Sequence, residues 1–301
     1  MDLFSWFRRR QAVKPVRASP SPFARGFGRL HLAGQPYALP KDLEESGRLD
    51  FQHFLLRLAF KGNYIAPIRN PSDILDVGCG TGRWAMEMAQ TFPNANVVGL
   101  DVVPPAQDRG HVFGYGLEGQ PENYAFVEGD VLKGLSFAER SFDFVHMRLL
   151  FAAIPGDKWP FVVSELVRVL RSGGWVQLLE AYPVPNGGPM LKRWQYWAEQ
   201  LSKRTGVDFT IGPHLGELLR YAGLQDVRQQ RLDLPVGKWG GRLGVMLEKD
   251  LTAMVRGVKF PIVKMGITTA EEYDGVCEAM IPEFATEREI FPFYVAYGRK
   301  P

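Results

Sequence analysis

The sequence predicts an α/β fold in three layers, with helices on both faces of a mostly parallel sheet. Short apolar runs alternate with amphipathic helical patterns from Asp73 onward. Each run is nearly uninterrupted, as expected for strands that are covered on both faces. The alternation of strand and helix indicates right-handed crossovers between parallel strands. The predicted strands are 74–77, 97–100, 124–127, 142–146 and 175–179, and the helices between them include 84–91 and 159–170.

Further segments flank this alternating core. Residues 41–60 carry apolar side chains at helical spacing, which predicts an amphipathic helix before the first strand. After residue 180 a loop rich in proline and glycine leads to an aromatic helix, and the stretch HLGELLRYAGL resumes the crossover pattern. A strand is predicted at 227–234, about fifty residues of helical pattern follow, and an apolar strand closes the chain.

These patterns predict one domain at 31–301 after a basic tail or linker at 1–30. The stretch ASPSPFARGFG within the tail is rich in proline, glycine and serine, which is typical of a linker. The expected core comprises about 65–182, 214–235 and 288–299, and the expected lid elements are about 41–64, 183–213 and 236–287.

Composition limits the classes of protein that fit. The chain has 301 residues, of which 46% are apolar, so it can bury a sizeable core. Cys79 and Cys277 are its two cysteines, too few for a disulfide framework or a cysteine-rich metal site. We therefore expect a globular protein of a reducing, cytoplasmic compartment without a metal. No apolar run approaches the roughly 18 to 20 residues that span a bilayer.

The charge is distributed unevenly. Residues 1–30 hold seven basic side chains and one acidic one, a net charge of +6, whereas the whole chain carries +3. The remainder is therefore mildly acidic, which argues against nucleic acid as a partner. The first ten residues, MDLFSWFRRR, place apolar side chains before arginines, the reverse of a secretory signal. They are either a mobile basic tail or a short segment that contacts a membrane surface or a protein.

The stretch DVGCGTGRW follows the first predicted strand and precedes a helix. Such glycine turns bind dinucleotides or S-adenosylmethionine. A dinucleotide site would need its third glycine where this chain has Arg83, and no Gly-Lys-Ser/Thr follows as in a phosphate cradle. The observed spacing of Gly78, Gly80 and Gly82 is instead the S-adenosylmethionine pattern of class I methyltransferases.

Two acids follow at the positions that this cofactor requires. Asp101 closes the second predicted strand, where a carboxylate can accept hydrogen bonds from both ribose hydroxyls. Asp130 follows the third strand, where it can accept from the adenine amino group, and the backbone of Val131 comes next. A solvated loop acid would be the ordinary explanation for either residue alone. Their order and spacing after the glycines favour the cofactor site.

With these motifs in place, residues 73–180 resemble the core of class I S-adenosylmethionine-dependent methyltransferases. A wider similarity over about 45–260 resembles the LaeA-like branch of small-molecule and regulatory methyltransferases. It is carried by GRLDFQHFLLRLAFKGNYIAPI, SFDFVHMRLLFAAI, GGWVQLLEA and LPVGKW. The resemblance implies a three-layer Rossmann-like fold with a seven-stranded sheet, an antiparallel last strand and helical lid insertions.

The resemblance also implies roles for individual residues. Gly78 and Gly80 would let the backbone approach the methionine part of S-adenosyl-L-methionine, and Asp76 would face its amino group. Tyr64 would either lie over the cofactor or pack as an ordinary half-buried tyrosine. The expected cofactor-binding residues are Tyr64, Asp76, Gly78, Gly80, Gly82, Asp101, Val102, Asp130, Val131 and His146.

Methyl transfer depends mainly on alignment and on exclusion of water. A general base is needed when the acceptor must lose a proton. Open α/β sheets bind ligands at the carboxyl ends of their strands. There, His146 and Arg148 end one predicted strand on a common face, and Glu180 and Tyr182 follow the next.

His146 could act as the base because imidazole titrates near neutral pH, or it could be a satisfied buried histidine. His53 could reach over the site from the helix at 41–60, or lie on that helix's surface. Arg148 could bind a substrate carboxylate or neutralise an internal acid. The candidate catalytic residues are thus His146, His53 and Glu180.

The added segments are rich in aromatic residues and methionine, which suit adaptable apolar pockets, although most such residues pack insertions together. Those outside the core pattern are Trp194, Trp197, Phe209, Trp239, Met246, Met254, Phe260 and Met265. We expect a small, largely apolar acceptor. The candidate substrate-binding residues are Arg148, Tyr182, Trp194 and Trp197.

The sequence leaves several functions open. The leading hypothesis is a methyltransferase of secondary metabolism. A second is a cofactor-binding regulatory protein with weak or no methyl transfer, which the LaeA-like resemblance and the basic start favour. Methylation of protein or RNA is a third, and an NAD-dependent oxidoreductase is disfavoured by Arg83.

Overall fold

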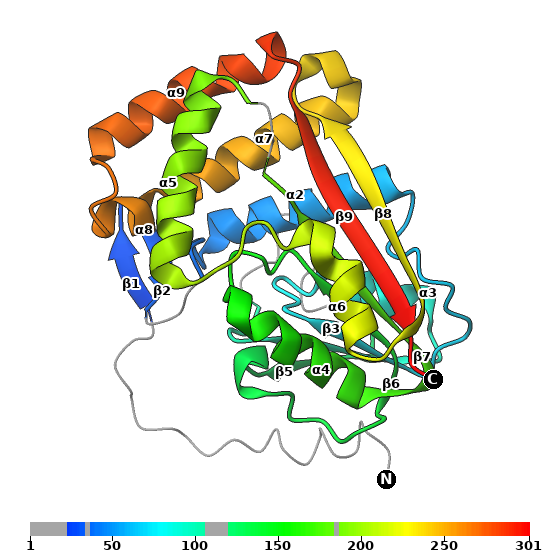
Figure 1. The fold of residues 1–301 in the computed structure, drawn as a ribbon. Helices are drawn as coiled ribbons and strands as arrows, with labels where there is room; N and C mark the ends of the chain where they lie inside the picture. Colours follow the sequence, from blue (N-terminus) through cyan, green and yellow to red (C-terminus); the bar gives the residue numbers. More distant parts are fainter. Residues whose placement is uncertain (1–22, 34–36, 106–119, 184–186) are drawn as a thin grey trace.

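The computed structural model describes residues 23–33, 37–105, 120–183 and 187–301. Figure 1 shows one body in which a twisted sheet lies below a layer of helices. The prediction that residues 1–10 contact a membrane or protein falls outside the described residues.

The sheet has seven strands in the order β5-β4-β3-β6-β7-β9-β8. The first five strands in this order pair in parallel, and β9 pairs antiparallel with both β7 and β8. The predicted sheet, including its antiparallel last strand, is therefore confirmed. Its strands are β3 (Asp73–Val77), β4 (Asn96–Asp101), β5 (Tyr124–Glu128), β6 (Phe142–Arg148), β7 (Leu170–Ala181), β8 (Gln225–Pro235) and β9 (Ile290–Arg299).

Helices cover both faces of the sheet, because both faces are apolar. One face packs on α3, where Trp84 and Met88 are buried with Ile74 of β3 and Phe144 of β6. The other face packs on α4 and α6, against alternate residues of the same strands such as Leu75 and Val145. The helices are α3 (Arg83–Thr91), α4 (Trp159–Val169) and α6 (Leu215–Tyr221).

A separate helical layer covers the end of the sheet where β6 and β7 finish (Figure 1). It has its own apolar core, in which Trp197, Tyr273 and Phe284 are almost fully buried. This layer contains helices from each of the three segments that the sequence predicted as lid elements, at about 41–64, 183–213 and 236–287. Its helices are α2 (Leu43–Phe60), α5 (Pro189–Thr205), α7 (Gly241–Gly257), α8 (Lys259–Lys264) and α9 (Ala270–Thr286).

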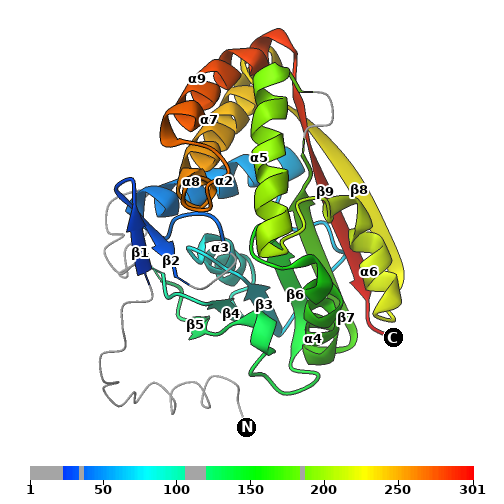
Figure 2. The same cartoon turned by 60° about the vertical axis from the view of Figure 1, so that its left-hand side comes forward.

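A hairpin of β1 (Phe23–Gly26) and β2 (Arg29–Leu32) lies beside α8 in Figure 2. The ring of His31 in β2 is 4.7 Å from the ring of Phe260 in α8. Residues 23–30 were predicted as part of the basic tail or linker at 1–30. They instead form most of this hairpin, with Phe27 and Gly28 in the turn and Gly28 at a φ of +77°.

The other predicted strands agree with the structure within a few residues, apart from the start of β7. It begins at Leu170, which was predicted as the last residue of a helix, because Leu170 pairs with Phe142 across a bulge in β6. Among the described residues, no helix has the length and apolarity to cross a bilayer. The same part of the chain holds no group of three metal-ligating side chains.

A substitution at Gly244, near the start of α7, tests how closely this helix packs against the backbone at Gly237. A Cβ added at Gly244 would overlap the backbone carbonyl oxygen of Gly237, which cannot move as a flexible side chain could. We expect Gly244→Ala to lower the free energy of unfolding by about 1–3 kcal/mol, measured by urea denaturation. Gly275→Ala in α9 is the control, since a Cβ there meets open space, and it should stabilise by about 0.5–1 kcal/mol. An unchanged stability in Gly244→Ala would contradict the close approach.

Candidate functional site

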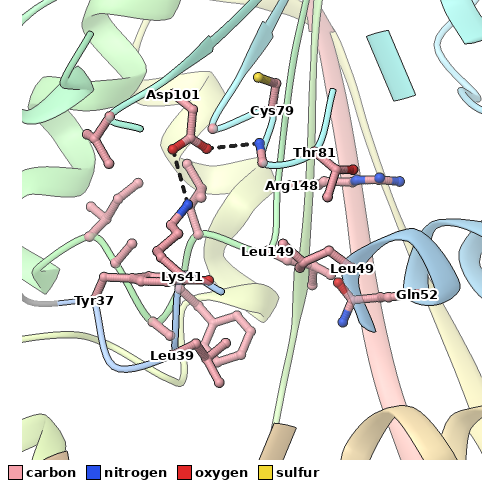
Figure 3. A pocket seen from close by; sticks show the side chains of 18 of the residues that line it. Tyr37, Leu39, Lys41, Leu49, Gln52, Cys79, Thr81, Asp101, Arg148 and Leu149 are labelled. Carbon is pink, nitrogen blue, oxygen red and sulfur yellow. Dashed lines mark hydrogen bonds and ion pairs between the residues drawn. The ribbon is translucent and has the colours of Figure 1, made fainter. Parts of the chain in front are cut away.

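A cavity opens at the carboxyl ends of β3, β4 and β6, beneath the helical layer (Figure 3). One end is lined by the glycine turn after β3 and by Asp101 and Asp130. The other end is lined by apolar side chains from the loop after β6, from α7 and from β9. These are Leu149, Phe151, Leu251, Met254, Phe291 and Phe293.

The glycine turn is held by the end of β4. The N–H groups of Gly78 and Cys79 both donate to the carbonyl oxygen of Leu100, at 2.7 and 3.0 Å. Gly78 has a φ of +68°, and an added Cβ would lie 2.7 Å from the side chain of Leu150. The positive φ therefore favours glycine at this position, and any larger residue would also displace the side chain of Leu150. The turn keeps its backbone open toward the cavity.

Asp101 lies beside this turn with both carboxylate oxygens engaged (Figure 3). Oδ2 accepts a hydrogen bond from the N–H of Gly80 at 2.9 Å, and Oδ1 lies 3.2 Å from Nζ of Lys41. Oδ1 also accepts from the N–H of Val103 at 3.3 Å, so one of the about four acceptor positions of this carboxylate remains for a ribose hydroxyl while Lys41 is bound. Asp101 faces the cavity as the sequence predicts for a ribose-binding acid.

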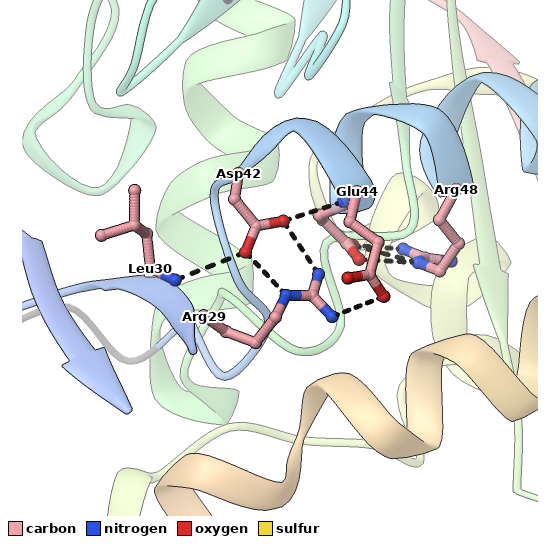
Figure 4. Close-up of polar contacts among 6 residues, drawn as sticks. Arg29, Leu30, Asp42, Glu44 and Arg48 are labelled. Carbon is pink, nitrogen blue, oxygen red and sulfur yellow. Dashed lines mark hydrogen bonds and ion pairs between the residues drawn. The ribbon is translucent and has the colours of Figure 1, made fainter. Parts of the chain in front are cut away.

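The residue after Lys41, Asp42, belongs to a group of hydrogen bonds and ion pairs between the hairpin and α2, which Figure 4 shows. Asp42 accepts two hydrogen bonds from Arg29 of the hairpin, at 2.7 and 2.9 Å, and its Oδ1 caps α2 by accepting from the N–H of Glu45 at 3.0 Å. Arg29 also pairs with Glu44 at 2.9 Å. These contacts join the hairpin to the start of α2. Lys41 lies between these two elements in the sequence, and its Nζ contacts Asp101.

Asp130 and Val131 also line the cavity. The carboxylate of Asp130 accepts from the N–H of Leu132 at 3.0 Å, which caps a short 3-10 helix, and lies 3.3 Å from Nζ of Lys133. Six of the ten predicted cofactor residues thus share this cavity: Gly78, Gly80, Asp101, Val102, Asp130 and Val131.

The other four predicted cofactor residues do not line this cavity. His146 is 1% exposed; its Nδ1 is 2.9 Å from Asp76 Oδ1, and its ring stacks on Trp84 with centroids 3.8 Å apart. Gly82, at a φ of +75°, precedes α3, and Tyr64 packs near Phe144 with ring centroids 6.1 Å apart. Asp76 and His146 form a buried pair that supports the strand ends.

His53 is placed between two charged groups. Its Nδ1 is 3.1 Å from Arg148 Nη2, and its Nε2 is 3.1 Å from Glu87 Oε2. A guanidinium can only donate, so Nδ1 must accept and the proton of a neutral ring sits on Nε2. Burial lowers the pKa of His53, which favours this neutral form. The lone pair that a base would use is already bonded to Arg148.

Glu180 has a positioning role for the loop after β6. It is 0% exposed, and its carboxylate accepts from the N–H groups of Leu150 and Phe151 at 2.9 and 3.1 Å. Burial raises the pKa of Glu180 to about 8, against the lowering effect of these two hydrogen bonds. Both loop residues line the cavity, so Glu180 shapes its wall from behind.

The predicted aromatic substrate residues pack elsewhere. Trp194 donates its indole N–H to the hydroxyl of Tyr273 at 3.0 Å, and Trp197 stacks on the same tyrosine with centroids 5.5 Å apart. Tyr182 packs edge-on against Tyr294 of β9. Of the bulky residues noted in the added segments, Met254 lines the cavity and Phe209 packs behind Phe151.

A buried polar cluster at the apolar end of the cavity was not predicted. Asp250 of α7 accepts from Arg48 Nη1 at 2.7 Å and from Gln52 Nε2 at 2.9 Å. Arg48 also binds Glu45, with a shortest contact of 2.6 Å. Arg48, Gln52 and Asp250 all line the cavity. The cluster ties α2 to α7 and presents polar atoms beside apolar walls.

Sequence reasoning missed these residues for a common reason. Lys41, Gln52 and Asp250 lie on added segments, and their distance along the chain conceals that they meet. Asp250 is an acid within an amphipathic helix whose neighbours on the same side are apolar, such as Leu247 and Leu251. A charged residue on the apolar side of a predicted helix is the one signal that could have indicated it.

Residues 74–174 match the family described as a methyltransferase domain. The chain is 29% identical over 220 residues to the secondary metabolism regulator LAE1 of Cochliobolus heterostrophus, an alignment that covers 67% of each chain. It is 28% identical to the regulator laeA of Aspergillus flavus, over 78% of this chain and 64% of that one. The chain therefore spans about two thirds of the length of these two regulators.

A relative named as an enzyme covers more of the chain. The N-methyltransferase sirN of Leptosphaeria maculans is 28% identical, over 88% of this chain and 95% of its own. Among solved structures, the YcgJ protein of Bacillus subtilis is 19% identical with a TM-score of 0.48, over 83% of this chain and 99% of that one.

Asp101 is the residue on which we expect the affinity for S-adenosylmethionine to depend most directly. Asp101→Ala removes the predicted acceptor of the ribose hydroxyls and should weaken binding by about 1–3 kcal/mol in isothermal titration. Asp233→Ala, at an exposed position of β8, is the matched control and should bind as the wild type does. An unchanged affinity in Asp101→Ala would remove the assignment.

Glu180 predicts a dependence of stability on pH. Its pKa is about 8 in the folded chain against 4.5 as the ordinary value, so the folded state binds more protons between these two values. The stabilisation is complete below about pH 4.5, falls as the pH rises and is lost above about pH 8. Between pH 6 and 9, the free energy of unfolding should fall by on the order of 1–3 kcal/mol.

Urea denaturation at several pH values measures this slope. Glu180→Gln should flatten it, because the side chain no longer titrates, whereas the exposed Glu199→Gln should leave it as it is. Equal slopes in the wild type and Glu180→Gln would show that Glu180 titrates normally.

Proposed function

We propose that this chain, which belongs to the class I S-adenosylmethionine-dependent methyltransferases of the LaeA-like branch, methylates a small, largely apolar metabolite in secondary metabolism. The observation that carries the proposal is the single cavity that joins the glycine turn to a wall of apolar side chains. The relatives that support the proposal include regulators of secondary metabolism and a protein named as an N-methyltransferase.

The described residues fit S-adenosylmethionine as methyl donor. The positive φ of Gly78 favours glycine in the turn, and the backbone of Gly78 and Gly80 lines the cavity. Asp101 would accept from the ribose, with Lys41 sharing its carboxylate, and Asp130 and Val131 would hold the adenine. The bound cofactor supplies an electrophilic methyl group on a sulfonium. The protein's task is then to align the acceptor and to exclude water.

The acceptor end of the cavity favours a molecule with an apolar body and one hydrogen-bond donor. Its walls of leucine, methionine and phenylalanine exclude water, whereas Asp250 and Gln52 offer polar atoms within them. An acceptor hydroxyl or amine could donate to Asp250, which would orient it and take up its proton on transfer. The contacts of His53, His146 and Glu180 give these three residues positioning roles in this proposal.

The second candidate is a regulatory protein that binds the cofactor and a protein partner. The observation in its favour is the similarity to two proteins named as regulators. In that case the acceptor, if any, is a protein, and the basic first residues contribute to docking. The mildly acidic remainder argues against nucleic acid as partner in either case. A reducing compartment such as the cytoplasm suits both.

Two measurements separate these functions. S-adenosylmethionine should bind in isothermal titration, and extracts incubated with methyl-labelled cofactor and the chain should yield a labelled small molecule by mass spectrometry. Deletion of residues 1–22, which leaves the hairpin intact, should preserve that labelling. If no small molecule is labelled and the deletion abolishes capture of a protein partner, the regulatory function is supported instead.

A further inference from the structure

Arg148, the last residue of β6, lines the cavity and has no acidic partner in direct contact. Its guanidinium donates from Nη2 to the neutral His53 at 3.1 Å. No carboxylate among the described residues forms an ion pair with it. A cation removed from water without an anion is costly, so the charge calls for an anionic ligand.

The nearby acids already have other partners. Asp76 is bonded to His146, Glu87 accepts from Arg57 at 2.8 Å, and Asp50 faces Arg83 at 3.4 Å. Burial lowers the pKa of the Arg148 guanidinium despite the raising effect of these three acids. They therefore do not compensate Arg148 fully.

The strand register shows which part of the cavity Arg148 faces. Residues of β3 pair in sequence with those of β6, from Ile74 with Phe144 to Val77 with Met147. The next position along this register sets Gly78 opposite Arg148. Gly78 also lines the cavity and begins the turn whose backbone approaches the cofactor. Arg148 thus leaves the sheet at the glycine end of the cavity, where the methionine part of the cofactor is expected.

We propose that Arg148 binds the α-carboxylate of the methionine moiety of S-adenosylmethionine. The inference rests on the proposed methyltransferase function, and it assigns Arg148 to the methyl donor instead of the acceptor. A guanidinium can bind a carboxylate through two parallel N–H···O bonds. His53 holds one side of the guanidinium and leaves the other N–H groups for the ligand, which makes His53 a positioning residue.

The test compares two ligands that differ in the carboxylate alone. Isothermal titration of the full chain would measure the affinity for S-adenosylmethionine and for decarboxylated S-adenosylmethionine. The wild type should bind the first about 10- to 100-fold more tightly, as expected for charge-assisted hydrogen bonds. In Arg148→Met this ratio should fall to about one, mainly through loss of affinity for the carboxylate-bearing ligand.

Arg57→Met is the matched control. Arg57 is a partly exposed arginine that binds Glu87, the acid next to His53. The Arg57 variant should keep the wild-type ratio of the two affinities. Should Arg148→Met fail to fold, Arg148→Lys keeps the charge but loses the planar fork, and its ratio should fall part of the way toward one. The proposal is overturned if a folded Arg148 variant keeps the wild-type ratio, or if it loses both ligands equally. Binding without any labelled metabolite would refute the proposed function and leave this assignment standing.

Discussion

The arrangement of the cavity depends on one backbone carbonyl, that of Leu100, which accepts two hydrogen bonds from the glycine turn. By accepting from Gly78 and Cys79, it fixes the turn after β3 to the end of β4. Asp101 follows immediately and accepts from Gly80, so the same strand end supplies both the clamp and the acid. The shape of the cavity at its cofactor end depends on these bonds between two adjacent parallel strands.

The sheet, and the meeting of six expected cofactor residues at one cavity, could be predicted because both depend on short-range patterns. Uninterrupted apolar runs identify strands such as β3, and the glycines with Asp101 and Asp130 follow each strand at fixed spacing. The start of β7 was missed because Arg171, Ser172 and Gly173 look like a turn, whereas Leu170 is drawn into the sheet by its pairing with Phe142. The strand pairing overrides the local sequence there.

The polar residues behind the cavity could not be assigned, because their roles depend on partners distant in the chain. His146 looks like a base until Asp76 and Trp84 are found against it, and His53 until Arg148 is seen to occupy its lone pair. Glu180 is bonded to the backbone of a loop thirty residues before it. The same reason hides Asp250, whose contacts with α2 span about two hundred positions.

The position of β9 has a consequence for how the chain folds. It lies between β7 and β8, so β8 has no other neighbour in the sheet until residues 290–299 arrive. The segment between β8 and β9 forms α7, α8 and α9. Asp250 of α7 lines the cavity. Docking of the last strand therefore closes a long loop, and because β9 also lines the cavity, the apolar end of the cavity is complete only after that docking. Such long-range pairing is slow to form. Before that step, β7 and β8 both present the edges that β9 later covers, and a chaperone or a second nascent chain could pair with them.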